Sequence, residues 1–495
     1  MHYEDLKPDP ACLVESMRDI GYSMETAIAD IIDNSLAASS SDIRLEFSWH
    51  DGAPWLVIID NGHGMSGKEL TSAMRMGSQT PLAVRDPSDL GRFGLGLKTA
   101  SFSQCRQLTV ISRKGEETSG RQWDLDILAS TENKGGWPLR ILGDDDFSSI
   151  PHVAELEECG TIVLWRKMDR LDNKDGPTVS ERKFNDLIDR TRRHLELVFH
   201  RYLSGERGIK RVRISINSHP LEAFDPYNQS HPATQTLQSE TIPVEGSANI
   251  VIQPFILPHH GKTTKEDYEK HAGDAGYLRN QGFYVYRNRR LIVHGTWFRL
   301  ARQEDITKLA RVQIDIPNTL DHLWNIDVKK SMANPPEVIR QRLKTIINRI
   351  RDTGANVYHR KGRRLTASTK EPIWVRRASS GEIRYEISRT HPIIQDLLSS
   401  LEPSAQQQFR DLIDAIESRF PTESFYNDVA TSPELLEQNK IADETIERLA
   451  LTYISRLKDA GMALEEIPQQ LLDVDPFARS HEATLKILKK EGFKV

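Results

Sequence analysis

Two polar residues near the N-terminus have the types and spacing to act together in chemistry. Asp30 and Asn34 stand in a run whose apolar residues recur with helical spacing, which predicts an amphipathic helix. Residues four positions apart share one face of a helix, so a carboxylate and an amide lie one turn apart. Mg²⁺ prefers oxygen ligands and usually keeps waters and phosphate oxygens, so one amide oxygen suffices. A solvated helix face that carries a capping asparagine explains the same pattern.

A second carboxylate follows a short apolar run. Residues 55–59 read Trp-Leu-Val-Ile-Ile, which predicts a strand buried on both faces, and Asp60 leads from it into Asn-Gly-His-Gly. A carboxylate at a strand end can accept a hydrogen bond from an exocyclic amine, and glycine lets the backbone approach a flat ligand closely. The alternative is a hairpin turn of the Asp-Asn-Gly type. Met65 and the lack of a strand-like run directly after the turn disfavour it.

A glycine-rich segment completes the set. Gly91, Gly94 and Gly96 precede the helical start Lys98-Thr-Ala-Ser-Phe. Backbone N–H groups in such a segment, with a helix N-terminus behind them, form a concave site for anions. The spacing differs from the Gly-x4-Gly-Lys-Ser/Thr pattern, which excludes a P-loop. Residues 66–90 are polar and contain proline and glycine, which fits a mobile lid; a plain surface loop is the alternative.

These motifs, in this order within residues 26–99, resemble the ATP-binding site of the GHKL superfamily: gyrase B, heat-shock chaperone, histidine kinase and MutL. The resemblance implies that ATP and Mg²⁺ are the cofactors. It implies that Asp30 orients or deprotonates the attacking water, that Asn34 binds Mg²⁺ and that Asp60 recognises adenine. The remaining nucleotide contacts are then expected from Gly62, Gly64, Met65, Gly91, Arg92, Phe93, Gly94, Leu95, Gly96, Leu97, Lys98, Thr99 and Thr161.

Position 30 departs from the family pattern. The family usually has Glu there, and Asp is one methylene shorter, so the rate of hydrolysis is open. Asp33 is the nearest rival for the water-activating carboxylate, although its position matches the family less well. A scaffold that binds ATP with little turnover is therefore one alternative. Thr161, in the strand-like run 160–165, joins the adenine–Asp60 network by resemblance, although threonine is also an ordinary strand residue.

Length and composition bound the broad class. A chain of 495 residues is too long for one compact core, and 28% charged with 38% hydrophobic residues is an ordinary globular composition. We expect no membrane association, because no apolar run approaches the ~20 residues of a membrane span. The N-terminus lacks the features of a signal peptide, and three scattered cysteines indicate neither disulfides nor zinc, so we expect a cytoplasmic protein. A net charge of −5 argues against a globally basic nucleic-acid binder.

The expected fold class is α/β, in the form of an α+β sandwich with a Bergerat-fold ATPase domain. Strand-like runs at 212–216, 281–286 and 312–316 suit an S5-like α/β transducer domain after it. The expected organisation is an ATP-binding domain at 1–205, a transducer domain at 206–352, a basic linker at 353–372 and a mostly helical region at 373–495.

Basic residues after the ATP-binding motifs have two possible uses. In the resembling ATPases a lysine of the second domain reaches the γ-phosphate, and Lys329 and Lys330 are the candidates. Strict alignment with MutL places that lysine at Asn334, and a solvated pair is the alternative. Other basic residues could contact DNA phosphates or form a solvated face. They are Arg287, Arg289 and Arg290 in one turn and Arg360, Lys361, Arg363 and Arg364 in the linker.

Within the superfamily the chain looks closest to bacterial MORC-like and MutL-like ATPases. Few residues precede the first motif, which disfavours a histidine kinase, and the chain has no room for the cleavage domains of a topoisomerase. The resemblance implies an ATP-gated homodimeric clamp that acts on DNA with a partner nuclease in a restriction-like or antiphage module. The alternative is a chaperone-like ATPase that acts on protein clients.

Overall fold

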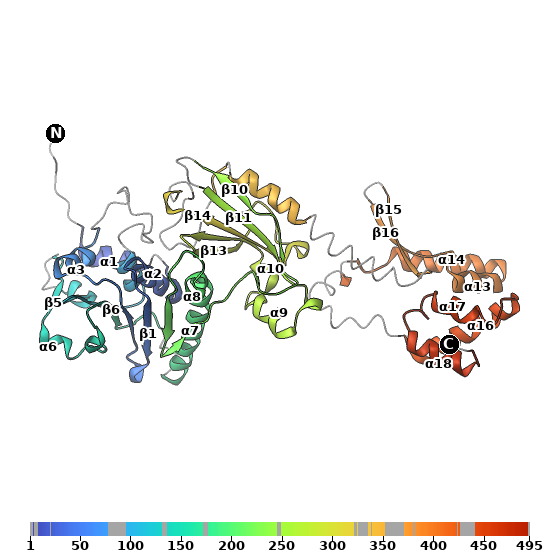
Figure 1. The fold of residues 1–495 in the computed structure, drawn as a ribbon, viewed down its shortest axis with the longest axis horizontal. Helices are drawn as coiled ribbons and strands as arrows, with labels where there is room; N and C mark the ends of the chain where they lie inside the picture. The colour runs from blue at the N-terminus through green and yellow to red at the C-terminus, as the bar shows by residue number, and fades with distance from the viewer. Residues whose placement is uncertain are drawn as a thin grey trace. The chain divides into compact units, whose positions relative to one another are not determined.

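The computed structural model describes most of the chain in two compact units, Met1–Ile350 and Arg351–Val495 (Figure 1). Each unit is described by itself below. The described residues are 3, 8–19, 21–77, 96–130, 136–171, 177–244, 249–320, 324, 335–337, 339–351, 371–379, 382–422, 424–425 and 441–493.

The first sheet of the N-terminal unit has eight strands in the order β5-β4-β3-β6-β2-β1-β7-β8. Neighbouring strands are antiparallel except for β1 and β7, which are parallel. The strands are β1 (Asp42–Ser48), β2 (Trp55–Asp60), β3 (Gln107–Lys114), β4 (Glu117–Asp124), β5 (Arg140–Leu142), β6 (Cys159–Arg166), β7 (Arg213–Ile216) and β8 (His219–Pro220).

Burial on both faces explains the apolar run of β2. Leu56 and Ile58 belong to the main core, whereas Val57 and Ile59 belong to a smaller core on the other face of the sheet. Helix α4 contacts α1 and α2, and α2 also contacts α7. All four helices contribute residues to the main core. The helices of this region are α1 (Pro10–Arg18), α2 (Met24–Ala37), α3 (Gly67–Met74), α4 (Gly96–Phe102), α5 (Leu125–Leu128), α6 (Asp144–Phe147), α7 (Pro177–Val198) and α8 (His200–Ser204).

The second sheet of the same unit has six strands. Its order is β10-β11-β14-β12-β13, and β9 pairs with β11. Buried residues of the helical stretch 339–351 complete its core. The elements are β9 (Gln235–Thr236), β10 (Glu240–Pro243), β11 (Asn249–Ile256), β12 (Gly282–Arg287), β13 (Arg290–Thr296), β14 (Ala310–Ile316), α9 (Lys265–Ala272) and α10 (Gly276–Asn280).

Two findings bear on the expected organisation. The α/β fold class is confirmed, because helices pack against mixed sheets. Residues 213–216, expected near the start of the second domain, instead pair with β1, so the first sheet continues past residue 205. The division into four domains stays a prediction.

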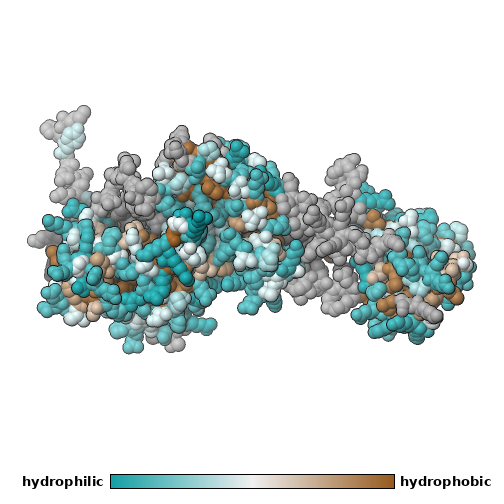
Figure 2. All heavy atoms as spheres, viewed as in Figure 1, coloured by the Kyte–Doolittle hydropathy of each residue, from teal (hydrophilic) through white to brown (hydrophobic). Residues whose placement is uncertain are grey.

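The C-terminal unit combines a hairpin with helices. Its core is built around Ile454, Leu471 and Phe477. No helix among the described residues is long and apolar enough to span a membrane. The described residues on the face shown in Figure 2 are mostly hydrophilic. The elements are β15 (Trp374–Ser379), β16 (Glu382–Ile387), α13 (Pro392–Ser400), α14 (Pro403–Ser418), α16 (Asp443–Asp459), α17 (Ile467–Leu472) and α18 (His481–Lys490).

Candidate functional site

Helix α2 positions the first pair of candidate residues. The helix begins after Ser23, whose side chain accepts a hydrogen bond from the Thr26 amide and so satisfies a helix N-terminal donor. Asp30 is buried and accepts a hydrogen bond from the Tyr22 hydroxyl at 2.9 Å, whereas Asn34 is exposed one turn later. The structure therefore supports the predicted helix and places a buried carboxylate beside an exposed amide.

The second candidate carboxylate lies at the end of β2, beside the same helix. Asp60 is buried, and its two carboxylate oxygens accept hydrogen bonds from the Ser35 hydroxyl at 2.8 Å and the Gly62 amide at 2.9 Å. Both donors are neutral, and burial raises the pKa of Asp60. Ser35 thus links the carboxylate to α2. A buried carboxylate with neutral partners can gain from a ligand that donates a further hydrogen bond.

The two glycines after Asp60, Gly62 and Gly64, lie so close to neighbouring atoms that a side chain would not fit at either position. Gly64 has a φ of +65°, and a Cβ there would lie 1.9 Å from the carbonyl oxygen of Arg113 on β3. At Gly62 a Cβ would lie 2.8 Å from the Cβ of Ala38 and 2.9 Å from an Asp60 carboxylate oxygen. The turn is therefore held close to the neighbouring backbone, which only glycine allows here.

Strand register brings Thr161 to this end of the sheet. Thr161 on β6 pairs with Asp60 on β2, and its hydroxyl lies 2.9 Å from the Ser112 hydroxyl. The Met65 amide donates to the same Ser112 hydroxyl at 2.8 Å. Sequence reasoning identified Thr161 and Met65 but missed Ser112 and Ser35. Ser35 directly follows Asn34, which was a weak available signal, whereas nothing in the local sequence marks Ser112.

The start of α4 lies beside Asp30. A Cβ built on Gly96 would be 4.0 Å from the Asp30 Oδ2 atom, so the end of the glycine-rich segment and the carboxylate are neighbours. Lys98 is buried, and its ammonium donates to the Ala73 carbonyl oxygen at 2.8 Å. Burial lowers the pKa of Lys98 to about 8. Leu97 and Thr99 share this helix.

Several predicted site residues lie outside the described part of the chain. They are Gly91, Arg92, Phe93, Gly94 and Leu95 of the glycine-rich segment, Lys329 and Lys330, and the linker residues Arg360, Lys361, Arg363 and Arg364.

The basic turn of the second sheet needs a correction. Arg287 and Arg290 are each only 5% exposed, so they are not surface side chains that can reach DNA phosphates. Arg290 instead forms a buried ion pair with Asp33 of α2 at 3.3 Å, because the β12–β13 hairpin packs onto the first part of the unit. Arg289 is half-buried and lies 3.7 Å from a Glu206 carboxylate oxygen. Asp33, the rival for the water-activating carboxylate, is thus engaged with an arginine.

Sequence comparisons agree with this geometry. Residues 22–161 match the family described as "Histidine kinase-, DNA gyrase B-, and HSP90-like ATPase". The chain is 29% identical over 89 residues to "ATPase morc-1" of Caenorhabditis elegans, which is 18% of this chain and 10% of that protein. It is 34% identical over 106 residues to "Chaperone protein HtpG" of Paramagnetospirillum magneticum, which is 19% of this chain and 17% of that protein.

A further relative is the human "Structural maintenance of chromosomes flexible hinge domain-containing protein 1", 30% identical over 115 residues. That match covers 18% of this chain and 6% of the relative, so the chain spans only a minor part of each relative's length. The matched family spans the motifs at Asp30, Asp60 and Gly96, and the resemblance expected from the sequence is confirmed. The likeness to the histidine kinase-, DNA gyrase B- and HSP90-like ATPases of the GHKL superfamily thus extends over residues 22–161.

Proposed function

We propose that this protein binds Mg·ATP at the Asp60 end of the first sheet and hydrolyses it. The observation that carries the proposal is the buried Asp60 carboxylate, held by Ser35 and Gly62 and flanked in register by Thr161. An adenine amine directed at this carboxylate adds a third hydrogen bond to a buried charged acceptor, which is stronger than a bond between two neutral groups. The close backbone at Gly64 gives the flat base a rigid wall.

The phosphates and the metal then lie toward α2 and α4. Asn34 is the proposed Mg²⁺ ligand, since its exposed amide oxygen is a hard donor and phosphates and waters supply the other ligands. The bound ion neutralises charge on the triphosphate when it is present. Asp30 is the proposed base for the attacking water, and its proximity to Gly96 places it beside the segment proposed to hold the phosphates.

Two substitutions on one helix test the proposal. Asp30→Ala is expected to retain Mg·ATP binding and to lose turnover by about 10²–10⁴-fold, because a general base acts on water and not on the nucleotide. Asn34→Ala is expected to weaken the Mg²⁺-dependent part of binding. Glu25→Ala, in the first turn of α2, is the control and is expected to leave both unchanged. Wild-type turnover by Asp30→Ala would assign the base to another group.

We further propose that ATP closes two copies into a clamp that acts on DNA with a partner nuclease, in a restriction-like or antiphage module. The partial likeness to the MORC and chromosome-maintenance relatives supports this reading. Exposed Arg342 and Lys344 in the helical stretch 339–351 are basic side chains that could contact phosphates. A slowly hydrolysed ATP analogue is expected to convert monomers into dimers, measured by light scattering. If the protein remains monomeric both with and without the analogue, the proposed clamp is wrong.

The likeness to HtpG supports a second candidate, a chaperone-like ATPase. DNA binding distinguishes the two functions, because phosphate contacts give a steep loss of affinity with salt, about −0.9 per contact on a log–log scale for duplex DNA. The clamp predicts this salt dependence in a filter-binding or anisotropy titration. Absence of DNA binding at low salt, together with stimulation of ATP hydrolysis by unfolded protein, favours the chaperone.

A further inference from the structure

Tyr22 makes a contact that the site residues considered so far do not explain. Its hydroxyl donates to the Asp30 Oδ2 atom at 2.9 Å, and both side chains are buried, with 8% of Tyr22 and 5% of Asp30 exposed. A hydrogen bond to an ionised carboxylate is stronger and more directional than one between neutral groups. The contact therefore restricts how the short Asp30 side chain can rotate.

Tyr22 is itself held at its ring and at its backbone. Its ring belongs to the main core of the N-terminal unit. Its backbone carbonyl accepts a hydrogen bond at 3.2 Å from the side-chain amide of Gln104, a buried residue that follows α4. Gln104 also donates to the Ser103 hydroxyl at 2.9 Å, so the amide that holds Tyr22 is fixed as well. The hydroxyl is thus presented to Asp30 from a rigid support that includes the segment after α4.

Both ends of α4 therefore converge on the same carboxylate. Gly96, at its start, lies next to Asp30 Oδ2, and Gln104, after its end, anchors the tyrosine that binds this oxygen. With Oδ2 held, the plane of the carboxylate is set, and so is the direction in which Oδ1 points. A base must be held within a fraction of an ångström of a productive position, and a misplacement of about 1 Å can cost 10²-fold in rate.

We propose that Tyr22 is a positioning residue for the hydrolysis of ATP: its hydroxyl orients the Asp30 carboxylate toward the attacking water. This inference rests on the proposed role of Asp30. The family position usually carries the longer Glu, and the tyrosine hydroxyl gives the shorter Asp a fixed orientation in this chain. Tyr22 touches neither nucleotide nor water in this account, so it acts only through Asp30.

Tyr22→Phe tests the proposal, because it removes the hydroxyl and keeps the ring in the core. We expect kcat for ATP hydrolysis to fall roughly 10- to 100-fold, with KM and the affinity for a slowly hydrolysed analogue unchanged. The melting temperature should fall only modestly, because a buried carboxylate loses one donor while the ring stays in the core, so the variant remains folded in the assay. Tyr277→Phe is the matched control: Tyr277 is 7% exposed, and its hydroxyl donates to a backbone carbonyl in the second-sheet region. That variant is expected to keep the wild-type kcat.

A double-mutant cycle separates this inference from the function on which it rests. In the Asp30→Asn background, Tyr22→Phe is expected to cause no further loss, because the hydroxyl acts through the carboxylate. If Asp30→Asn hydrolyses ATP at the wild-type rate, the role of Asp30 is wrong. If Asp30→Asn is inactive while Tyr22→Phe keeps the wild-type kcat, or if the two losses multiply, Asp30 stands as the base and the positioning role of Tyr22 is overturned.

Discussion

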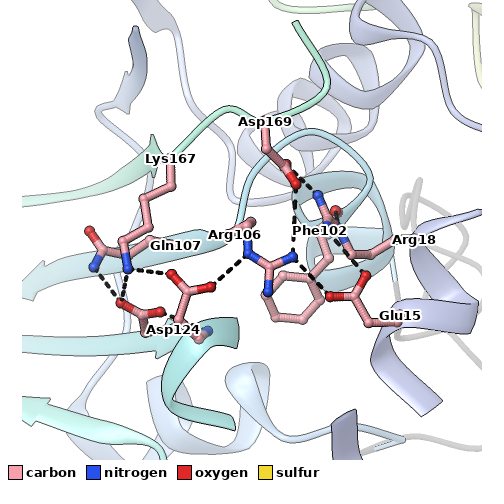
Figure 3. Close-up of polar contacts among 9 residues, drawn as sticks. Glu15, Arg18, Phe102, Arg106, Gln107, Asp124, Lys167 and Asp169 are labelled. Carbon is pink, nitrogen blue, oxygen red and sulfur yellow. Dashed lines mark hydrogen bonds and ion pairs between the residues drawn. The ribbon is translucent and has the colours of Figure 1, made fainter. Parts of the chain in front are cut away.

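At the end of the first sheet where β2 finishes, the buried Asp60 carboxylate accepts hydrogen bonds from a serine hydroxyl and a backbone amide. At the opposite end, where β3 begins and β6 finishes, carboxylates and cations pair with one another (Figure 3). Lys167 lies between Asp124 and Asp126 at 2.8 and 2.7 Å, and Arg106 donates to Asp126 at 2.7 Å.

These ion pairs continue onto the N-terminal helix. Arg106 also reaches Glu15 of α1 at 2.9 Å, and Arg18 pairs with Asp169 while its Nε donates to the Phe102 carbonyl oxygen at 2.8 Å (Figure 3). Phe102 ends α4, so the network ties α1 to the helix that follows the glycine-rich segment. At this end of the sheet, oppositely charged side chains pair with one another and connect α1 to the sheet.

The pKa directions follow the same division. Hydrogen bonds from Lys167 and Arg106 lower the pKa of Asp126, whereas burial raises the pKa of Asp60. A carboxylate with a raised pKa carries an electrostatic cost in its charged form, and a ligand donor can relieve that cost. On the proposed function, the comparison teaches that the ligand site is marked by the buried carboxylate held by neutral donors and not by the density of charged groups.

The largest effect is expected from backbone geometry at the Asp60 end. Gly64→Ala should lower the free energy of unfolding by about 2–4 kcal/mol, since a positive φ is strained for alanine and the added carbon meets the Arg113 carbonyl. Gly115→Ala has a similar φ of +64° with no atom within 4 Å of the added carbon, and it isolates the strain alone. If chemical denaturation finds the same loss of unfolding free energy for both variants, the contact with the Arg113 carbonyl adds no destabilisation.

Removing the Asp60 charge should affect binding and spare the fold. Asp60→Asn is expected to weaken ATP binding by about 1.5–3 kcal/mol, or roughly ten- to a hundredfold, because a charged acceptor is lost. The Ser35 hydroxyl can reverse its hydrogen bond and accept from the new amide, so folding is retained. Asp126→Asn is the control at the opposite end of the sheet. Calorimetry that finds both variants at wild-type affinity would place the adenine elsewhere.

The raised pKa of Asp60 predicts a dependence of binding on pH. Protonation removes the charged acceptor, so ATP affinity should fall as the pH is lowered through this pKa, which lies above the ordinary value of 3.8. Asp60→Asn cannot titrate, and the difference between wild type and variant therefore isolates this group from the protonation of ATP itself. Parallel affinity–pH curves for the two proteins would contradict the assignment.

The smallest effect is expected from the ion-pair network. Arg106→Met keeps much of the aliphatic packing and should cost about 1 kcal/mol of stability or less, because its carboxylate partners are about half exposed and can be solvated. ATP affinity should be unchanged. If Arg106→Met loses as much ATP affinity as Asp60→Asn, the two ends of the sheet do not have the separate roles described here.

The sequence predicted elements whose signals are local. The apolar spacing around Asp30 and Asn34 predicted α2, the continuous apolar run predicted β2, and the glycine after it marked the turn at Gly64. Each signal follows from the geometry of one helix, strand or turn, so no knowledge of the tertiary structure is needed. The order of the motifs then indicated the family, which the comparison with known families confirmed.

Contacts between distant segments were not predictable in this way. Ser112 reaches Thr161 through strand register. Tyr22 is only eight positions from Asp30, yet their contact depends on how the segment before α2 packs into the core. Arg290 was expected at the surface because basic residues usually are, yet its partner Asp33 lies 257 positions earlier in the chain. A single polar residue in a strand or turn carries no spacing signal, so only the fold reveals its partner.

Calorimetric titration of the full chain with slowly hydrolysed analogues of ATP and GTP in the presence of Mg²⁺ tests the central claim most directly. The account predicts that the ATP analogue binds with one site per chain. Guanine presents a carbonyl oxygen where adenine presents its amine, so the GTP analogue should bind at least about tenfold more weakly against the Asp60 carboxylate. No binding of the ATP analogue, or equal affinity for both, would contradict the assignment of this end of the sheet to adenine.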